Sequence, residues 1–162
     1  MAIIFLRHAK VQRCFQKRFL GWSDVDIDKS LFEFQKVEVL KKREFNYVFA
    51  SNLKRTWQTL ELLDKDFLVD ERVNEVKFKD EIELKSFDEI SQFDTFKSSY
   101  LDSLESWHRF VAKESLEEFR SRIESFLNSL DRSKEILVCT HAGVLREIFK
   151  REFDYLEWDE LS

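Results

Sequence analysis

Residues 2–9 read AIIFLRHA, a short apolar run that leads directly into Arg7 and His8. A run of this length and composition predicts a buried strand of an α/β sheet. Arg7 and His8 would then stand at the carboxyl end of the strand, where open α/β sheets place their ligand sites. An imidazole can act there as a nucleophile or base, and a guanidinium can hold an anion. Taken alone, the pair is equally consistent with a strand end that faces solvent.

Two further apolar runs end in residues of the same kind. Residues 46–50 predict a second buried strand, followed by SNLKRT and a helix with Arg55 in its first turn. Residues 135–140 predict a third strand, which delivers His141 to its carboxyl end and leads into a last helix. An arginine beside a helix N-terminus, as Arg55 is here, favours an anion site, although most arginines are simply surface residues.

A further short strand is expected at residues 67–69.

Strands that alternate with helices indicate a mostly parallel sheet, so the carboxyl ends of these strands should share one edge. His8, His141, Arg7 and Arg55 would meet there. Such a group suits a phosphoryl dianion, whose charge is spread over several oxygens. It suits a metal ion poorly, because neither histidine has a second ligand at close spacing and the arginines would repel a cation. We therefore expect neither a metal site nor a cofactor.

A basic loop follows the first strand. Arg13, Lys17 and Arg18 precede the sequence GWSD at residues 21–24. A charge cluster of this kind is usually a solvated surface. The alternative is that one of these cations, with Arg18 the best placed, contacts the substrate anion.

Helical spacing predicts three further segments. Residues 31–43 follow a capping-box pattern at Ser30, and residues 116–130 follow a second such pattern at Ser115. Residues 87–107 have a broken helical period, and their aromatic stripe is expected to belong to the core. The adjacent His108 is expected to be solvated or to cap a helix.

The composition predicts one globular domain over residues 1–162. Hydrophobic residues make up 43% of the chain and charged residues 36%, with a net charge of -5. The acidic balance argues against general binding to nucleic acid or to membrane surfaces, and no apolar stretch has the length of a membrane span. Cys14 and Cys139 are too few for a disulfide framework, and no signal peptide is recognisable. The expected location is therefore the cytoplasm.

Together, these motifs resemble the histidine phosphatase superfamily, also called the phosphoglycerate mutase-like family. The likeness covers almost the whole chain in the family's order, and the combination is far more specific than any single motif. The matching segments are LRHA at residues 6–9, Gly21 and Asp24 of the first loop, SNLKRTWQT at residues 51–59, Glu75 and Phe78 of the acidic motif, and CTHAGV at residues 139–144.

The resemblance implies a three-layer α/β/α fold with a mostly parallel central sheet and a short lid insertion. It implies that His8 is the nucleophile and Glu75 the general acid and base. Arg7, Arg55 and His141 would stabilise charge in the transition state. The substrate-binding residues it implies are Arg7, Arg18, Gly21, Arg55, His141 and Ala142.

The chain also departs from the family pattern. Ala9 and Ala142 stand where glycine is usual, and Cys14 stands where many members have an asparagine that contacts phosphate. Lys79 and Glu81 replace the glycine and tryptophan that usually follow the acidic residue. Glu75 could therefore also be a surface carboxylate, and the acidic motif is the weakest of the matches.

The resemblance favours a phosphomonoester hydrolase, close to the α-ribazole phosphatase-like enzymes, that acts through a phosphohistidine on His8. Phosphoglycerate mutase is an alternative, but the short segment between Glu75 and the third predicted strand favours hydrolysis. A second alternative is a non-catalytic phosphate-binding or scaffolding protein with a degenerate pocket. The partner would be a small phosphorylated metabolite or a phosphohistidine protein, with no nucleic acid or membrane. A homodimer stays open, and the sequence does not name the substrate.

Overall fold

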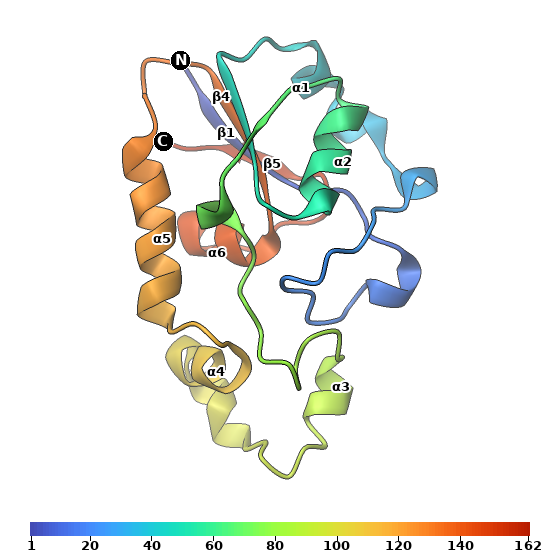
Figure 1. Cartoon of the computed structure of the whole chain (residues 1–162), viewed down its shortest axis with the longest axis vertical. Helices are drawn as coiled ribbons and strands as arrows, with labels where there is room; N and C mark the ends of the chain where they lie inside the picture. The colour runs from blue at the N-terminus through green and yellow to red at the C-terminus, as the bar shows by residue number, and fades with distance from the viewer.

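The computed structural model describes all 162 residues and contains one five-stranded sheet (Figure 1). The strand order is β3-β2-β4-β1-β5, and every neighbouring pair is parallel except β1 and β5. The strands are β1 (Ile3–Arg7), β2 (Tyr47–Ala50), β3 (Leu68–Val69), β4 (Ile136–Thr140) and β5 (Trp158–Glu160). The predicted α/β fold with a mostly parallel sheet is confirmed, since the three strong apolar runs form its centre.

Six α-helices connect and flank these strands, with short 3₁₀ turns between them. The helices are α1 (Glu38–Lys42), α2 (Lys54–Leu62), α3 (Phe87–Ile90), α4 (Leu104–Val111), α5 (Leu116–Ser129) and α6 (Ala142–Phe149). The 3₁₀ turns are Arg13–Phe15, Lys29–Leu31, Phe34–Lys36, Glu71–Val73 and Ser98–Asp102. None of the helices combines the length and the apolar character needed to cross a lipid bilayer.

Alternate residues of the central strands bury opposite faces of the sheet, and different helices cover each face (Figure 1). On one face, Leu137 of β4 shares a hydrophobic cluster with Leu60 of α2. On the other face, the next residue, Val138, shares a cluster with Phe126 of α5 and Leu145 of α6. This alternation produces the three α/β/α layers that the resemblance implied.

A third hydrophobic core, beyond the two on the faces of the sheet, lies at the end of the molecule toward which the parallel strands run. There α3 and α4 close over the chain that follows β3 (Figure 1). Ile90 of α3, Val111 of α4, Phe119 of α5 and Val144 of α6 belong to this core. The α3–α4 segment is the short insertion expected between Glu75 and β4.

The helix predicted over residues 31–43 is wrong for most of its length. Two 3₁₀ turns occupy its first half, and only α1 is α-helical. The expected capping box at Ser30 does not form, because Asp28 accepts hydrogen bonds from both the amide and the hydroxyl of Ser30. With its hydroxyl hydrogen-bonded to Asp28, Ser30 does not cap a longer helix.

The strand β5 was not predicted, and it completes the sheet beside β1. It pairs antiparallel with β1, with Phe5 opposite Asp159 and Leu6 opposite Trp158. Its three residues are polar or only partly buried, so they lack the apolar run that marks the central strands. As a result β1, which carries Arg7 and precedes His8, is hydrogen-bonded on both sides.

Candidate active site

The carboxyl ends of the parallel strands bring His8 and His141 together. His8 follows β1 directly, and His141 stands between β4 and α6. Their ring centroids lie 5.1 Å apart, and both side chains are buried. Arg7 and Arg55 are close enough to act electrostatically on both rings. The structure thus gathers the four residues that the strand-end pattern predicted to meet.

The His8 ring is held in one tautomer by the backbone. Its Nδ1 lies 2.8 Å from the carbonyl oxygen of Ala9, so Nδ1–H donates and Nε2 keeps its lone pair. Burial lowers the pKa of His8 well below its ordinary value of 6.5, and the charges of Arg55 and Arg7 lower it further. A neutral imidazole with a free Nε2 is the form that can attack phosphorus.

His141 has one satisfied and one unsatisfied nitrogen. Its Nε2 shares a hydrogen bond of 2.7 Å with the hydroxyl of Ser51, which follows β2. Its Nδ1 is buried and has no hydrogen-bond partner. Burial lowers the pKa of His141 well below 6.5, and Arg55 and His8 add to the effect.

The two arginines are anchored by backbone carbonyls. Arg7 donates from Nη1 to the carbonyl of Phe153 at 2.6 Å, and its guanidinium lies 3.9 Å from the ring centroid of Tyr155. Arg55 donates to the carbonyls of Gly21 and Ser23 at 2.7 and 3.0 Å. Burial lowers the pKa of Arg55 to about 10, so the group stays charged at neutral pH.

Three buried nitrogens around the site lack hydrogen-bond partners: Arg7 Nε, Arg55 Nε and His141 Nδ1. Buried polar atoms are nearly always paired, so three such atoms on three converging side chains point to a ligand with several acceptor oxygens. A phosphoryl group has such oxygens and the opposite charge. All three atoms are shielded from solvent.

Glu75 lies against the first turn of α6. One of its carboxylate oxygens accepts from the amide of Gly143 at 3.1 Å, and the other accepts from the amide of Val76 at 2.9 Å. A methyl group at residue 143 would collide with the carboxylate of Glu75. The glycine is therefore needed for this close approach, and Glu75, which is 8% exposed, is not a surface carboxylate.

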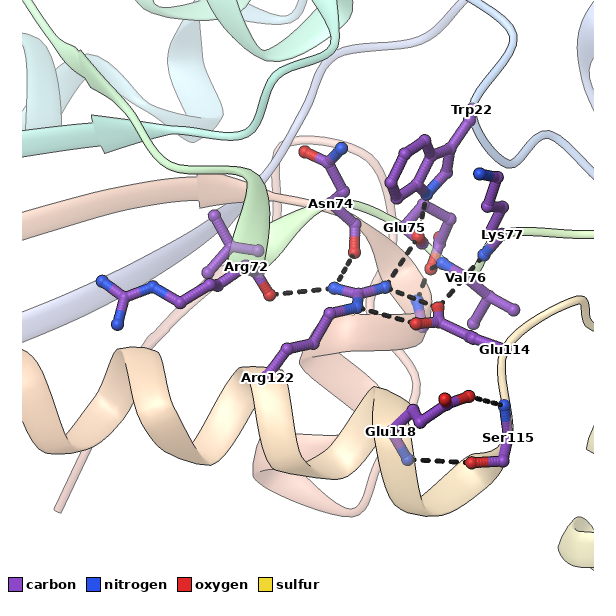
Figure 2. Close-up of polar contacts among 12 residues, drawn as sticks. Trp22, Arg72, Asn74, Glu75, Val76, Lys77, Glu114, Ser115, Glu118 and Arg122 are labelled. Carbon is purple, nitrogen blue, oxygen red and sulfur yellow. Dashed lines mark hydrogen bonds and ion pairs between the residues drawn. The ribbon is translucent and has the colours of Figure 1, made fainter.

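The main chain around Glu75 is held by side chains rather than by the sheet, as Figure 2 shows. Arg122 of α5 donates to the carbonyls of Arg72, Asn74 and Glu75 at 2.7 to 2.9 Å. The same guanidinium forms two hydrogen bonds to Glu114, at 2.7 and 3.0 Å. The indole of Trp22 also donates to the Glu75 carbonyl, at 2.8 Å.

Ala142, Arg18 and Gly21 were also expected to bind substrate, and they differ in how they lie relative to the cavity. Ala142 lines the cavity described below. Arg18 also lines it, but its guanidinium is hydrogen-bonded to the carbonyls of Cys14 and Leu84 and to the carboxylate of Glu89. Gly21 is not part of the lining; it supports Arg55 through its carbonyl.

Gly21 is required by close packing. A Cβ at this position would lie 2.6 Å from the carbonyl oxygen of Val76 and 2.7 Å from a carboxylate oxygen of Glu83. The Glu83 carboxylate accepts from the amides of Gly21 and Ser23 and so fixes the loop whose carbonyls hold Arg55. Neither distance leaves room for a side chain.

A cavity of about 600 Å³ opens over the site. Its apolar lining comes chiefly from the first loop, α4 and α5. Its charged and polar lining is spread more widely, over Arg7, His8, Arg18, Glu75, His108, Arg120, Arg146, Glu147, Lys150 and Tyr155. Arg55 and His141 are fully buried and are not part of the lining. No group of three or more His, Cys, Asp or Glu side chains has the arrangement of a metal site.

Two residues that line the cavity were not expected there: His108 was predicted to have another environment, and Tyr155 was not singled out. His108 was expected to be solvated or to cap a helix, but it is only 5% exposed, and its Nε2 lies 3.1 Å from the carbonyl oxygen of Glu114. Tyr155 was not singled out, yet its ring packs edge-on against His8 at 5.7 Å. It lies beyond the last motif of the chain, where no sequence signal marked it.

A family model, a relative in sequence and two solved structures all relate this chain to phosphatases and phosphoglycerate mutases. Residues 3–159 match the histidine phosphatase superfamily, branch 1. A protein assigned as phosphoserine phosphatase 2 in Hydrogenobacter thermophilus is 29% identical over 157 residues, covering 90% of this chain and 75% of that one. The α-ribazole phosphatase from Shigella flexneri has a TM-score of 0.75 at 21% identity, covering 98% and 88% of the two chains. Phosphoglycerate mutase from Thermus thermophilus has a TM-score of 0.72 at 19% identity, covering 100% and 99%.

Proposed function

We propose that this chain, which belongs to the histidine phosphatase superfamily, hydrolyses phosphate monoesters through a phosphohistidine on His8. The observation that carries the proposal is the state of His8. Its Nδ1 is bonded to a backbone carbonyl, and its pKa is lowered by burial and by two arginines, which leaves Nε2 free to attack. The unpaired nitrogens of Arg7, Arg55 and His141 would donate to the phosphoryl oxygens.

The reaction would proceed in two steps, both without a metal ion. In the first step, Nε2 of His8 attacks phosphorus, the bond from phosphorus to the ester oxygen breaks, and Glu75 gives a proton to the departing alkoxide. In the second step, water attacks the phosphorus of the phosphohistidine, Glu75 takes a proton from the water, the bond from phosphorus to Nε2 breaks, and inorganic phosphate leaves. Glu75 and His8 both line the cavity, so both can reach a substrate bound in it.

The alternatives are a phosphoglycerate mutase and a non-catalytic phosphate-binding protein. A mutase must keep its phosphohistidine away from water, which favours a substantial lid. Here α3 and α4 span only a short insertion, and Leu104 of the cavity lining is 48% exposed. A short insertion of this kind favours a site that water can enter. Hydrolysis is the reaction that fits this opening.

The proposal is tested by trapping the intermediate. The protein is mixed with p-nitrophenyl phosphate, quenched in alkali to preserve phosphohistidine, and measured by intact mass. We expect one phosphoryl group on the wild type and none on His8→Ala, which should lose turnover by a factor of about 10³ or more. Turnover retained by His8→Ala would contradict the mechanism, and the absence of both phosphohistidine and turnover in the wild type would favour the binding protein.

A second measurement separates hydrolysis from transfer. The same reaction run with added 3-phosphoglycerate or glycerol shows whether the phosphoryl group goes to water or to an acceptor hydroxyl. Release of inorganic phosphate in step with p-nitrophenol is the expected result. Transfer of most of the phosphate to phosphoglycerate would favour the mutase.

A further inference from the structure

The cavity has two chemically different sides. The side around His8 and Glu75 is polar and would hold the phosphoryl group. Another part of the lining is an aromatic wall, in which the Phe19 ring lies 5.4 Å from that of Phe78 and 5.8 Å from that of Trp107. The leaving group of a bound phosphomonoester would therefore meet apolar surface.

Apart from Arg7 in the phosphoryl site, each cation of the lining is already in an ion pair, and Arg120 and Lys150 share Glu147. Each of these paired cations has a protein carboxylate within 2.5 to 3.0 Å. A substrate carboxylate would have to displace one of these partners to gain an ion pair. The pairs are Arg18–Glu89, Arg120–Glu147, Lys150–Glu147 and Arg146–Glu152.

From these two observations we infer the substrate class, and the inference rests on the proposed phosphatase function. The substrate is a phosphate monoester of an uncharged, largely apolar alcohol that carries an aromatic ring or similar bulk. Burying the ring against Phe19, Phe78 and Trp107 supplies binding energy that a small charged alcohol lacks. Phosphoserine and phosphoglycerate bring a carboxylate that would have to compete with these protein carboxylates for a cation.

The test compares three primary alkyl phosphates whose ester bonds are chemically alike: 2-phenylethyl phosphate, O-phosphoserine and 3-phosphoglycerate. We expect kcat/KM for 2-phenylethyl phosphate to exceed the other two by about tenfold or more. Equal or higher kcat/KM for either carboxylate substrate would overturn the inference. Failure of the proposed function is distinguishable, because then no substrate turns over and no phosphohistidine forms.

A matched pair of variants tests the apolar lining at Leu104, which lies one helical turn before Trp107 in α4. Leu104→Ser changes an exposed residue of the lining, and Leu101→Ser changes a leucine that is 54% exposed and lies outside the cavity. We expect Leu104→Ser to lower kcat/KM for 2-phenylethyl phosphate by about 3- to 10-fold while leaving phosphoserine turnover unchanged. Leu101→Ser should change neither. Equal effects of the two variants would show that the leaving group does not bind this part of the apolar lining.

A second inference rests on a different observation, the network in Figure 2. The Glu75 carbonyl is held by the side chains of Arg122 and Trp22, and Glu114 fixes the Arg122 guanidinium through two hydrogen bonds. Glu114 also accepts from the amide of Lys77 at 3.2 Å. One ion pair thus holds the chain on both sides of the catalytic carboxylate.

We infer that Arg122 and Glu114 are positioning residues for Glu75. Neither lines the cavity, so neither contacts the substrate. Both side chains are largely buried, at 17% and 15% exposed. Loss of the pair would let the Glu75 carboxylate shift away from the leaving oxygen. A shift of about 1 Å in the position of a catalytic group can lower the rate by about 100-fold.

The test measures how kcat depends on the leaving group of the substrate. Alkyl phosphates need a proton on the departing oxygen, whereas p-nitrophenolate departs almost without one. We expect Arg122→Ala to lower kcat for 2-phenylethyl phosphate by about 10- to 100-fold and to leave p-nitrophenyl phosphate within about threefold of the wild type. Equal loss on both substrates would indicate a structural role and overturn the inference.

Two controls complete this test. Arg109→Ala removes an exposed ion pair with Glu105 on α4 and should leave both rates unchanged. Glu114→Gln keeps the shape of the side chain and removes its charge, so it tests the same pair if Arg122→Ala does not fold. It should show the same dependence on the leaving group to a smaller degree, and equal rates to the wild type on both substrates would contradict the role of the pair.

Discussion

Residue 143 has no room for a side chain, because the carboxylate of Glu75 fills the space that a Cβ would need. Replacing Gly143 with alanine should therefore push Glu75 out of place without disturbing the hydrophobic cores. We expect kcat for alkyl phosphates to fall by about 100-fold, since the acid would no longer meet the leaving oxygen. Kinetics with 2-phenylethyl phosphate and thermal unfolding, measured side by side, would check this. A fully active Gly143→Ala would show that the carboxylate does not act from its present position.

The sequence predicted the central residues of the site because they lie next to strong strands. Arg7, His8 and His141 adjoin buried apolar runs, so the edge on which they stand could be deduced from the chain order. The supporting residues could not be deduced in this way. Tyr155 and Arg122 reach the site from remote parts of the chain, and only the folded structure shows their contacts.

At the scale of elements, the start of α5 is held by a capping box. The Ser115 hydroxyl accepts from the amide of Glu118, and the Glu118 carboxylate accepts from the amide of Ser115. Replacing Ser115 with alanine should lower the free energy of unfolding by about 1 kcal/mol. Urea denaturation would measure the change, with Ser121→Ala on the exposed surface of the same helix as the control. A loss no larger than that of Ser121→Ala would mean that the box does not stabilise the helix.

The same local rule failed at Ser30 for a physical reason. Both serines have a glutamate three residues later, but Ser30 also has Asp28 beside it, and Asp28 caps the 3₁₀ turn Lys29–Leu31 instead. A competing local acceptor decides between a helix and a turn, and the pattern of Ser and Glu alone does not register it. Strand β5 was missed because an edge strand needs only one partner and carries no apolar run.

At the scale of the whole molecule, all three histidines are buried with lowered pKa values, each chiefly because of desolvation. The unfolded chain therefore takes up protons first as the pH falls through the ordinary histidine pKa of 6.5. Their contribution to stability is complete above that value and is lost as the pH falls below it. We expect the free energy of unfolding to drop between pH 7.5 and 5.5, with a limiting slope of about 1.4 kcal/mol per pH unit for each histidine.

Urea denaturation across that range would measure this slope. His108→Gln removes one of the three groups and leaves His8 and His141 in place. Its slope should be about a third smaller than that of the wild type. A free energy of unfolding that stays constant from pH 7.5 to 5.5 would contradict the burial of neutral histidines.

Because β1 is hydrogen-bonded on both sides, its backbone amides should be protected from exchange with solvent. The strand has backbone partners in β4 and β5, and the amide of His8 donates to the carbonyl of Thr140 at 3.0 Å. Deuterium should therefore enter the backbone amides of β1 only when the whole domain opens. The segment around Glu75 is tied to α5 and the first loop by side chains, so its amides should exchange sooner, by local opening. The nucleophile His8 would then keep a fixed position, and the proton donor Glu75 would be the group that moves toward the substrate.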